Sequence, residues 1–268
     1  MVAKYGGAVK IAISGKGGVG KTTLAGVLSR IYAEEGKKVL AVDADPDANL
    51  ASSLGFGVEE VSAITPISQM KELIEERTGT RAGAMGAMFK INPTVDDIPD
   101  KYSVEKNGIK LLMMGTVKKG GTGCYCPENV LLKSLLTHML VERDEVVIVD
   151  MEAGIEHLGR GTAYGMDAFI VVVEPGQRSI QTAHNIKKLA SDINIKNVFV
   201  VGNKINSKQD EEFIKSNLDD MKVIGFISYN PDVIISDLEG VSPFDRGGGV
   251  VKEVKKIKQR LEEKLKTV

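Results

Sequence analysis

The residues best suited to chemistry lie in one glycine-rich loop, Gly15 to Thr23, directly after the apolar run Val9 to Ser14. The loop has the spacing Gly-x-x-x-x-Gly-Lys-Thr, with Lys21 and Thr22 at its end. Glycines let successive backbone N–H groups converge on phosphate oxygens, the lysine adds positive charge at the outer phosphates, and the threonine hydroxyl suits Mg²⁺. We therefore predict a nucleotide-binding loop with contacts from Gly15, Gly17, Gly18, Val19, Gly20, Lys21, Thr22 and Thr23.

Lys16 is a second lysine in the same loop, and the general phosphate-binding pattern does not require it. The whole run Gly15 to Thr23 resembles the deviant P-loop ATPases, a family that includes MinD, ParA, the nitrogenase iron protein and the CooC-type metallochaperones. In that family the extra lysine reaches across a two-fold axis to the nucleotide of a partner subunit. The resemblance implies an ATP-sandwich homodimer in which Lys16 is catalytic, because its charge stabilises the charge that develops at the phosphates.

Aspartates follow two further apolar runs. Carboxylates at a strand end beside a phosphate loop can hold Mg²⁺ through water or orient the attacking water. The segment with Asp43, Asp45 and Pro46 resembles the switch I segment of the family, which implies that Asp45 orients the water and that Asp43 lies on the metal side. Asp150 suits the Walker B position that holds a Mg²⁺-bound water, and Gly154 can bring its backbone amide to the γ-phosphate because no side chain blocks it.

Asn203 and Lys204 are the candidates for base recognition. The Asn203 side chain can present both a donor and an acceptor to adenine. A guanine-selective Asn-Lys-x-Asp motif would need aspartate where this chain has Asn206. We therefore predict ATP rather than GTP as the nucleotide.

Both cysteines of the chain, Cys124 and Cys126, lie in the segment 121–127. Thiolates two positions apart can face one metal ion such as Ni²⁺ or Zn²⁺, but two ligands are too few for a closed site. A two-fold homodimer would supply four. The Cys-x-Cys pair resembles that of CooC-type nickel-insertion ATPases, which mature carbon monoxide dehydrogenase or the related acetyl-CoA synthase. The resemblance implies ATP-driven nickel insertion into such a client enzyme, with Zn²⁺ as the alternative metal and two buried, apolar cysteines as the alternative without a metal.

Two other functions also fit parts of the sequence. A MinD-like positioning ATPase would carry a membrane-binding amphipathic helix at its C-terminus. The apolar stripe from Val251 to Leu265 has no Trp or Phe, and glutamates dilute its basic flanks, so we expect a helix docked on the core. An iron–sulfur cluster carrier would also need paired thiolates. However, the nitrogenase iron protein has its two cysteines far apart in sequence, and the cluster-scaffold ATPases use Cys-x-x-Cys.

The elements that must position these residues are visible as short Val- and Ile-rich runs alternating with longer amphipathic segments. This pattern predicts an α/β fold, a mostly parallel β-sheet flanked by helices on both faces, with functional groups at the carboxyl ends of the strands. Strands are predicted over residues 9–14, 38–43, 109–113, 145–150, 168–173, 197–202 and 222–227. Helices are predicted over residues 21–35, 66–77, 127–142, 178–192, 208–218 and 250–265.

The length and composition of the chain limit the number of domains and the kinds of partner that we expect. A chain of 268 residues with 43% hydrophobic content fits one ATPase domain over 1–268, with an insertion around 79–108 that shows no clear periodicity. Lys plus Arg (35) nearly equals Asp plus Glu (36), so no net field favours nucleic acid as a partner. No signal-peptide core and no run of about 20 apolar residues is present, and we expect a cytoplasmic protein without a membrane partner.

Overall fold

The computed structural model describes residues 8–81, 88–115, 126–153, 158 and 160–267. Eight strands lie in these ranges: β1 (Lys10–Gly15), β2 (Val39–Ala44), β3 (Val104–Lys106), β4 (Ile109–Met113), β5 (Val146–Met151), β6 (Ala168–Val173), β7 (Val198–Ile205) and β8 (Lys222–Ser228). They form a sheet in the order β3-β4-β2-β5-β1-β6-β7-β8, in which β3 is antiparallel to β4 and the other neighbours are parallel. The predicted fold class is confirmed.

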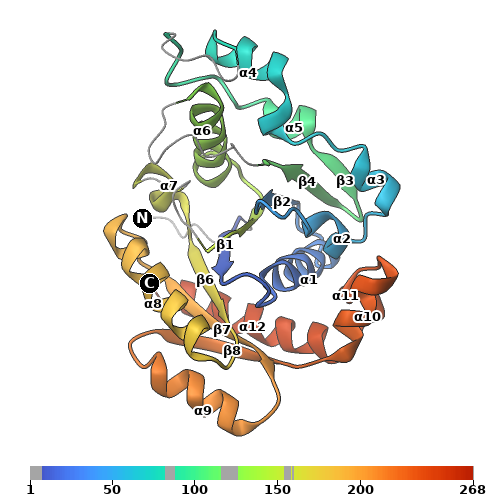
Figure 1. Ribbon diagram of the computed structural model, residues 1–268, viewed down its shortest axis with the longest axis vertical. Coiled ribbons are helices and arrows are strands. Elements are labelled where there is room, and N and C mark those ends of the chain that lie inside the picture. Colours follow the sequence, from blue (N-terminus) through green and yellow to red (C-terminus); the bar gives the residue numbers. More distant parts are fainter. Residues whose placement is uncertain (1–7, 82–87, 116–125, 154–157, 159, 268) are drawn as a thin grey trace.

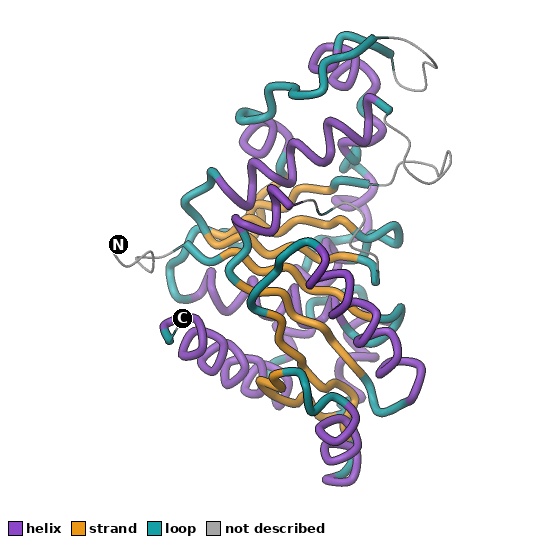
Figure 2. The backbone as a smooth tube through the Cα atoms, turned by 90° about the vertical axis from the view of Figure 1, so that its left-hand side faces the viewer, coloured by secondary structure: helices purple, strands orange, loops and turns teal. Residues whose placement is uncertain are grey.

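The helices cover both faces of this sheet (Figures 1 and 2). The longer ones are α1 (Lys21–Glu34), α4 (Lys71–Thr78), α6 (Pro127–Val141), α8 (Gln177–Asp192), α9 (Lys208–Asn217), α10 (Pro231–Glu239) and α12 (Gly249–Lys266). The short ones are α2 (Leu50–Leu54), α3 (Val58–Ser62), α5 (Ile98–Tyr102), α7 (Arg160–Gly165), α11 (Pro243–Arg246) and a 3₁₀ turn over Ile67–Gln69.

The central strands have continuous apolar sequences because both faces of the sheet are covered. All six residues of β5 are buried, and those of β1 and β6 are buried as well. Alternate residues point to opposite faces. Ala12 and Val149 join a core built with α4, α6 and α8, whereas Ile13 and Ile148 join a second core built with α1, α2 and α12.

The seven predicted strands all occur, and the differences lie at the edges of the fold. β7 runs to Ile205, three residues beyond its predicted end. The helix predicted over 66–77 is a 3₁₀ turn followed by α4, because the chain leaves helical geometry at Met70, whose ψ is 78°. The segment 98–106, which showed no periodicity, forms α5 and β3.

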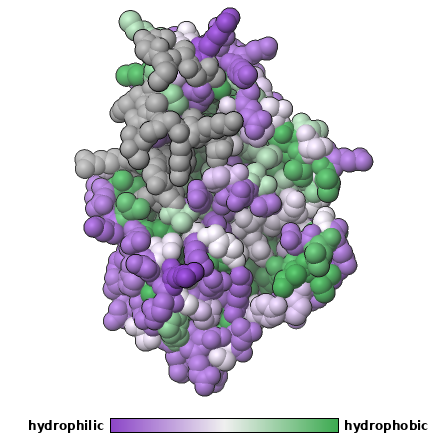
Figure 3. Space-filling model, in the orientation of Figure 1, coloured by the Kyte–Doolittle hydropathy of each residue, from purple (hydrophilic) through white to green (hydrophobic). Residues whose placement is uncertain are grey.

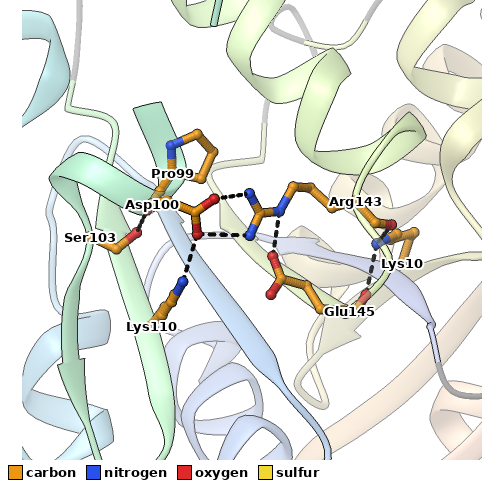
Figure 4. Close-up of polar contacts among 7 residues, drawn as sticks. All are labelled: Lys10, Pro99, Asp100, Ser103, Lys110, Arg143 and Glu145. Atoms are coloured by element: carbon orange, nitrogen blue, oxygen red, sulfur yellow. Dashed lines mark hydrogen bonds and ion pairs between the residues drawn. The ribbon is translucent and has the colours of Figure 1, made fainter. Parts of the chain in front are cut away.

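A cluster of charged side chains anchors this segment to the sheet (Figure 4). The Asp100 carboxylate, just before β3, accepts hydrogen bonds from Arg143 (2.7 Å) and Lys110 (2.6 Å). These two cations hold the pKa of Asp100 well below its usual range. Arg143 also donates to Glu145 at 2.6 Å, and the buried Lys10 ammonium donates to the backbone carbonyl of Glu145 at 2.7 Å. Ion pairs therefore join α5 to the amino-terminal ends of the parallel strands.

The C-terminal helix α12 is docked on the second core. Val254, Ile257 and Leu261 are buried against α1 and β8. Gly225 in β8 allows this close packing, because a Cβ atom there would lie 2.4 Å from Ile257. The expected core helix is confirmed. The described helices include none with an apolar stretch sufficient to span a lipid bilayer.

Helix α10 leaves apolar side chains at the surface. Ile234 is 49% exposed and Leu238 81% exposed, and an apolar area is visible at the lower right of Figure 3. The helix starts at Pro231, with Asn230 capping the backbone N–H of Asp232. Its apolar residues do not define one buried stripe, which is why periodicity did not predict it.

Candidate functional site

The glycine-rich loop joins β1 to the first turn of α1. Gly20 is the N-cap residue of α1 and has a φ of 96°, a left-handed conformation that favours glycine. A Cβ atom on Gly20 would lie 2.1 Å from Nδ2 of Asn203, and one on Gly15 would lie 2.4 Å from the carbonyl oxygen of Val172. Among the residues that the structure describes, no side chain caps the N-terminus of α1. Its first N–H groups are therefore available to bind phosphate.

Asn203 and Lys204, at the carboxyl end of β7, bind the backbone of this loop. Asn203 Nδ2 donates to the carbonyl oxygen of Val19 at 2.7 Å, and Lys204 Nζ donates to that of Gly18 at 2.7 Å. The side-chain oxygen Oδ1 of Asn203 accepts from the Lys204 backbone N–H at 2.8 Å. Both side chains thus support the shape of the phosphate loop in this structure. Their predicted contact with adenine stays a prediction.

Thr22 and Asp150 meet where the loop approaches β5. Thr22 Oγ1 donates to Asp150 Oδ2 at 2.6 Å. Asp150 is fully buried, and its Oδ1 atom has no hydrogen-bond partner among the described residues. Burial raises the pKa of this carboxyl group to about 7. A buried carboxylate oxygen without a partner, beside a hydroxyl, matches the oxygen ligands that Mg²⁺ prefers. The residues present therefore fit a magnesium ion bound together with a nucleotide.

Asp43 lies beside Asp150 in the register of β2 and β5. Its two carboxylate oxygens accept backbone hydrogen bonds from Asp45 (3.3 Å) and Leu50 (3.0 Å). Burial raises the pKa of Asp43 to about 6. Asp43 therefore holds the loop between β2 and α2 in place, and a proton or a cation would relieve the burial of its charge.

Asp45 forms an ion pair with the lysine of the phosphate loop. Lys21 Nζ lies 3.4 Å from Asp45 Oδ2, and these side chains are only 6% and 12% exposed. The Asp45 Oδ1 atom accepts from the Asp47 backbone N–H at 3.0 Å. The structure thus brings the predicted water-orienting aspartate directly to the lysine that is predicted to bind phosphate.

Lys16 contacts a residue that the sequence did not single out. Lys16 Nζ lies 3.4 Å from Glu174 Oε1, and Lys204 Nζ lies 3.1 Å from Glu174 Oε2. Glu174 follows β6 directly, at the same edge as Asp43 and Asp150. Glu174 could have been found from its position at the carboxyl end of a predicted strand. Functional groups gather at these ends, and Asp43 and Asp150 were selected for that reason.

Two of the predicted site residues, Cys124 and Gly154, lie outside the described residues. Cys126 is half-buried and is the N-cap residue of α6, with Pro127 opening the helix. In the described ranges no group of three or more His, Cys, Asp or Glu side chains could hold a metal ion. A site shared between two copies of Cys124 and Cys126 therefore remains a prediction.

Comparison with known proteins identifies the family. The model of the CobQ/CobB/MinD/ParA nucleotide binding domain matches residues 10–244. The chain belongs to this family. The carbon monoxide dehydrogenase accessory protein CooC of Rhodospirillum rubrum is 48% identical over 88% of this chain and 90% of its own length. An uncharacterised ATP-binding protein of Methanocaldococcus jannaschii is also 48% identical, over 93% of this chain and 96% of its own. A CooC-type ATPase, as predicted, is confirmed.

Solved structures of the family have the same fold. The MinD cell division protein of Aquifex aeolicus aligns with a TM-score of 0.67 at 22% identity, covering 96% of this chain and 97% of that chain. A ParA family ATPase of Chlorobium tepidum aligns with a TM-score of 0.66 at 17% identity, covering 95% and 98%. These likenesses confirm the P-loop ATPase fold of the chain.

Proposed function

We propose that this ATPase is a metallochaperone that inserts nickel into a client metalloenzyme such as carbon monoxide dehydrogenase or acetyl-CoA synthase. The CooC protein of Rhodospirillum rubrum, named as a carbon monoxide dehydrogenase accessory protein, supports the client. The Cys124 and Cys126 pair supports a metal cargo. The observation that carries the ATP-dependent part is the convergence of Lys21, Thr22, Asp45 and Asp150 at one edge of the sheet.

The contacts of these residues indicate what each does when nucleotide binds. Bound Mg²⁺ would supply positive charge at the phosphates, held by Thr22 and, through water, by Asp150. Lys21 exchanges its contact with Asp45 for a phosphate oxygen. Asp45 is thereby released to orient the attacking water, so that the same movement binds ATP and prepares its hydrolysis.

The remaining roles depend on a homodimer. Lys16 crosses to the nucleotide of the partner subunit, and two copies of Cys124 and Cys126 supply four thiolates for one Ni²⁺ ion, with Zn²⁺ as the competing metal. Hydrolysis loosens the dimer and hands the metal to the client. Turnover is slow because the closed state must persist until transfer. Nucleic acid and membranes are not partners, and the protein works in the cytoplasm.

The docked C-terminal helix separates this proposal from a membrane-positioning ATPase. The apolar stripe of α12 is buried in the core, so it is not available to bind lipid. ATP should therefore not cause the protein to sediment with anionic liposomes. Sedimentation that disappears when residues 250–268 are removed would favour the positioning function instead.

The proposed function is tested by transfer of nickel to its client. Protein loaded with one equivalent of Ni²⁺ per dimer, together with Mg-ATP, should activate nickel-free carbon monoxide dehydrogenase faster than the same concentration of free Ni²⁺. Cys126→Ala should lose the activation because the metal is not held, and Lys21→Ala should lose it because ATP is not bound. Equal activation by the parent protein and by Cys126→Ala would contradict the proposal.

A further inference from the structure

The carboxylate of Glu174 lies between two lysines of the nucleotide edge. Its Oε1 atom is 3.4 Å from Lys16 Nζ, and its Oε2 atom is 3.1 Å from Lys204 Nζ. In the proposed dimer, Lys16 reaches the nucleotide of the partner subunit. In this structure the Lys16 side chain is instead paired within its own chain.

We propose that Glu174 is a positioning residue that retains Lys16 in its own subunit until nucleotide binds and the two subunits close. This inference rests on the ATP-dependent homodimer of the proposed function. Each Lys16 side chain can pair with its own Glu174 or reach the partner's nucleotide, but not both. The contact therefore opposes closure of the dimer. The free energy gained from bound ATP must exceed the cost of breaking it.

Glu174 is the fixed member of the pair. It follows the buried strand β6 and precedes Pro175, and its backbone N–H donates to Ser179 Oγ at 3.1 Å. Lys204 is also held, since its Nζ atom donates to the Gly18 carbonyl at 2.7 Å. The Lys16 side chain is 38% exposed and makes no other hydrogen bond or ion pair among the described residues. The lysine is therefore the member that moves.

Lys204 makes the contact between Lys16 and Glu174 easy to break. When Lys16 leaves, Glu174 keeps its ion pair with Lys204 and is not left as an unpaired charge. A partly exposed ion pair of this kind changes an equilibrium by roughly 1.4- to 5-fold. A dimer releases two such pairs, so the effect on its dissociation constant is roughly 2- to 30-fold.

The test compares the dimer dissociation constants of the parent protein and Glu174→Gln. They are measured by sedimentation with Mg²⁺ and saturating non-hydrolysable ATP analogue, without nickel. Glutamine has the same shape but no charge, so it still accepts a hydrogen bond from Lys204 while releasing Lys16. We expect the variant to dimerise roughly 2- to 30-fold more tightly at low salt. The difference should shrink as salt is raised towards 1 M, where screening acts within about 3 Å.

Two further proteins separate this role from a general effect of charge. Glu211→Gln removes an equal charge and a surface ion pair with Lys215 on α9, and it should leave the dissociation constant unchanged. In a Lys16→Ala background there is no lysine to retain, so Glu174→Gln should have no effect. Equal tightening in that background would overturn the proposal.

Dimerisation of the parent protein tests the ATP-dependent homodimer, and the comparison with Glu174→Gln tests the role of Glu174. If the parent forms no dimer with the ATP analogue, the ATP-dependent homodimer of the proposed function fails, and the role of Glu174 fails with it. If the parent dimerises and Glu174→Gln is no tighter, the role of Glu174 alone is wrong. Melting curves followed by circular dichroism check that each variant is folded.

Discussion

Thr22 Oγ1 and Asp150 Oδ2 are joined by a hydrogen bond of 2.6 Å between the phosphate loop and the end of β5. The two residues are far apart in sequence, but their strands β1 and β5 are parallel neighbours. The other Asp150 oxygen is buried and has no partner in the part of the chain that the structure describes. This pair therefore joins the oxygen atoms that we propose to hold Mg²⁺ to the loop that we propose to bind the phosphates.

Asp150→Asn should abolish magnesium-dependent hydrolysis without unfolding the protein. The amide cannot supply the negative charge, and we expect at least about a hundredfold loss of turnover. Because burial raises the pKa of Asp150, the parent protein is destabilised by ionising this group. The variant should thus unfold at an equal or higher denaturant concentration in EDTA at pH 8. A marked loss of stability would show that the Thr22 contact is mainly structural.

Lys16→Ala and Asp45→Asn should separate the steps of the ATPase cycle. Lys16→Ala should bind Mg-ATP normally but turn over about 10³-fold more slowly, as expected when a cation supplied in trans is removed. Asp45→Asn should also bind ATP, and it should accumulate as an ATP-bound dimer. Nucleotide affinity, phosphate release and sedimentation measured on the same preparations check this. Normal turnover in Asp45→Asn would remove that residue from the mechanism.

Leu261→Ala should destabilise the protein by about 2–5 kcal/mol, because it leaves a cavity between α12 and the second core. Lys256→Ala, on the exposed side of the same helix, is the matched control and should change the unfolding free energy by less than about 0.5 kcal/mol. Urea titrations compare the two. Equal, small effects would mean that α12 is not docked in solution.

Asp97→Asn tests the packing of the segment before β3. Lys101 and Arg77 lower the pKa of Asp97 to about 2, each through a contact of 2.7 Å. Because the pKa is lower in the folded state, ionised Asp97 stabilises the fold at pH values above its unfolded pKa near 4. This stabilisation is lost as the pH falls towards 2. The variant should therefore be less stable at pH 7 by up to about 1 kcal/mol, and the difference should vanish near pH 2. A difference that does not depend on pH would contradict the ion pairs.

The sequence predicted the parts of the fold that follow from strong local patterns. A run of apolar residues such as Val146 to Val149 is typical of a strand that is buried on both faces of a sheet. The parallel strands, and the edge where their carboxyl ends meet, were therefore predictable. Strand β3 is three residues long and half exposed, and it depends on pairing with β4 and on the ion pairs of Asp100. Such long-range contacts leave no periodicity in the sequence.

The residues of the candidate site also divide into those that the sequence predicted and those that it did not. Lys21, Thr22, Asp43 and Asp150 belong to spacings that have a chemical reason, and the structure brings them together. Asn203 was predicted to read the base, yet its amide binds the phosphate loop at Val19. A short polar side chain at a strand end can bind either backbone or ligand, and sequence does not distinguish them. Glu174 belongs to no spacing, and only the fold places it beside Lys16.

The most direct test of the account is the nickel stoichiometry of anaerobically purified, untagged protein, measured with and without Mg²⁺ and a non-hydrolysable ATP analogue. We predict one tightly bound Ni²⁺ per two chains, a shift from monomer to dimer on binding, and higher nickel affinity with the nucleotide present. Cys124→Ala, Cys126→Ala and the double variant should lose most of this affinity while they still bind ATP. One nickel ion per monomer, or unchanged nickel binding in the double variant, would contradict a metal site shared between subunits and coupled to ATP.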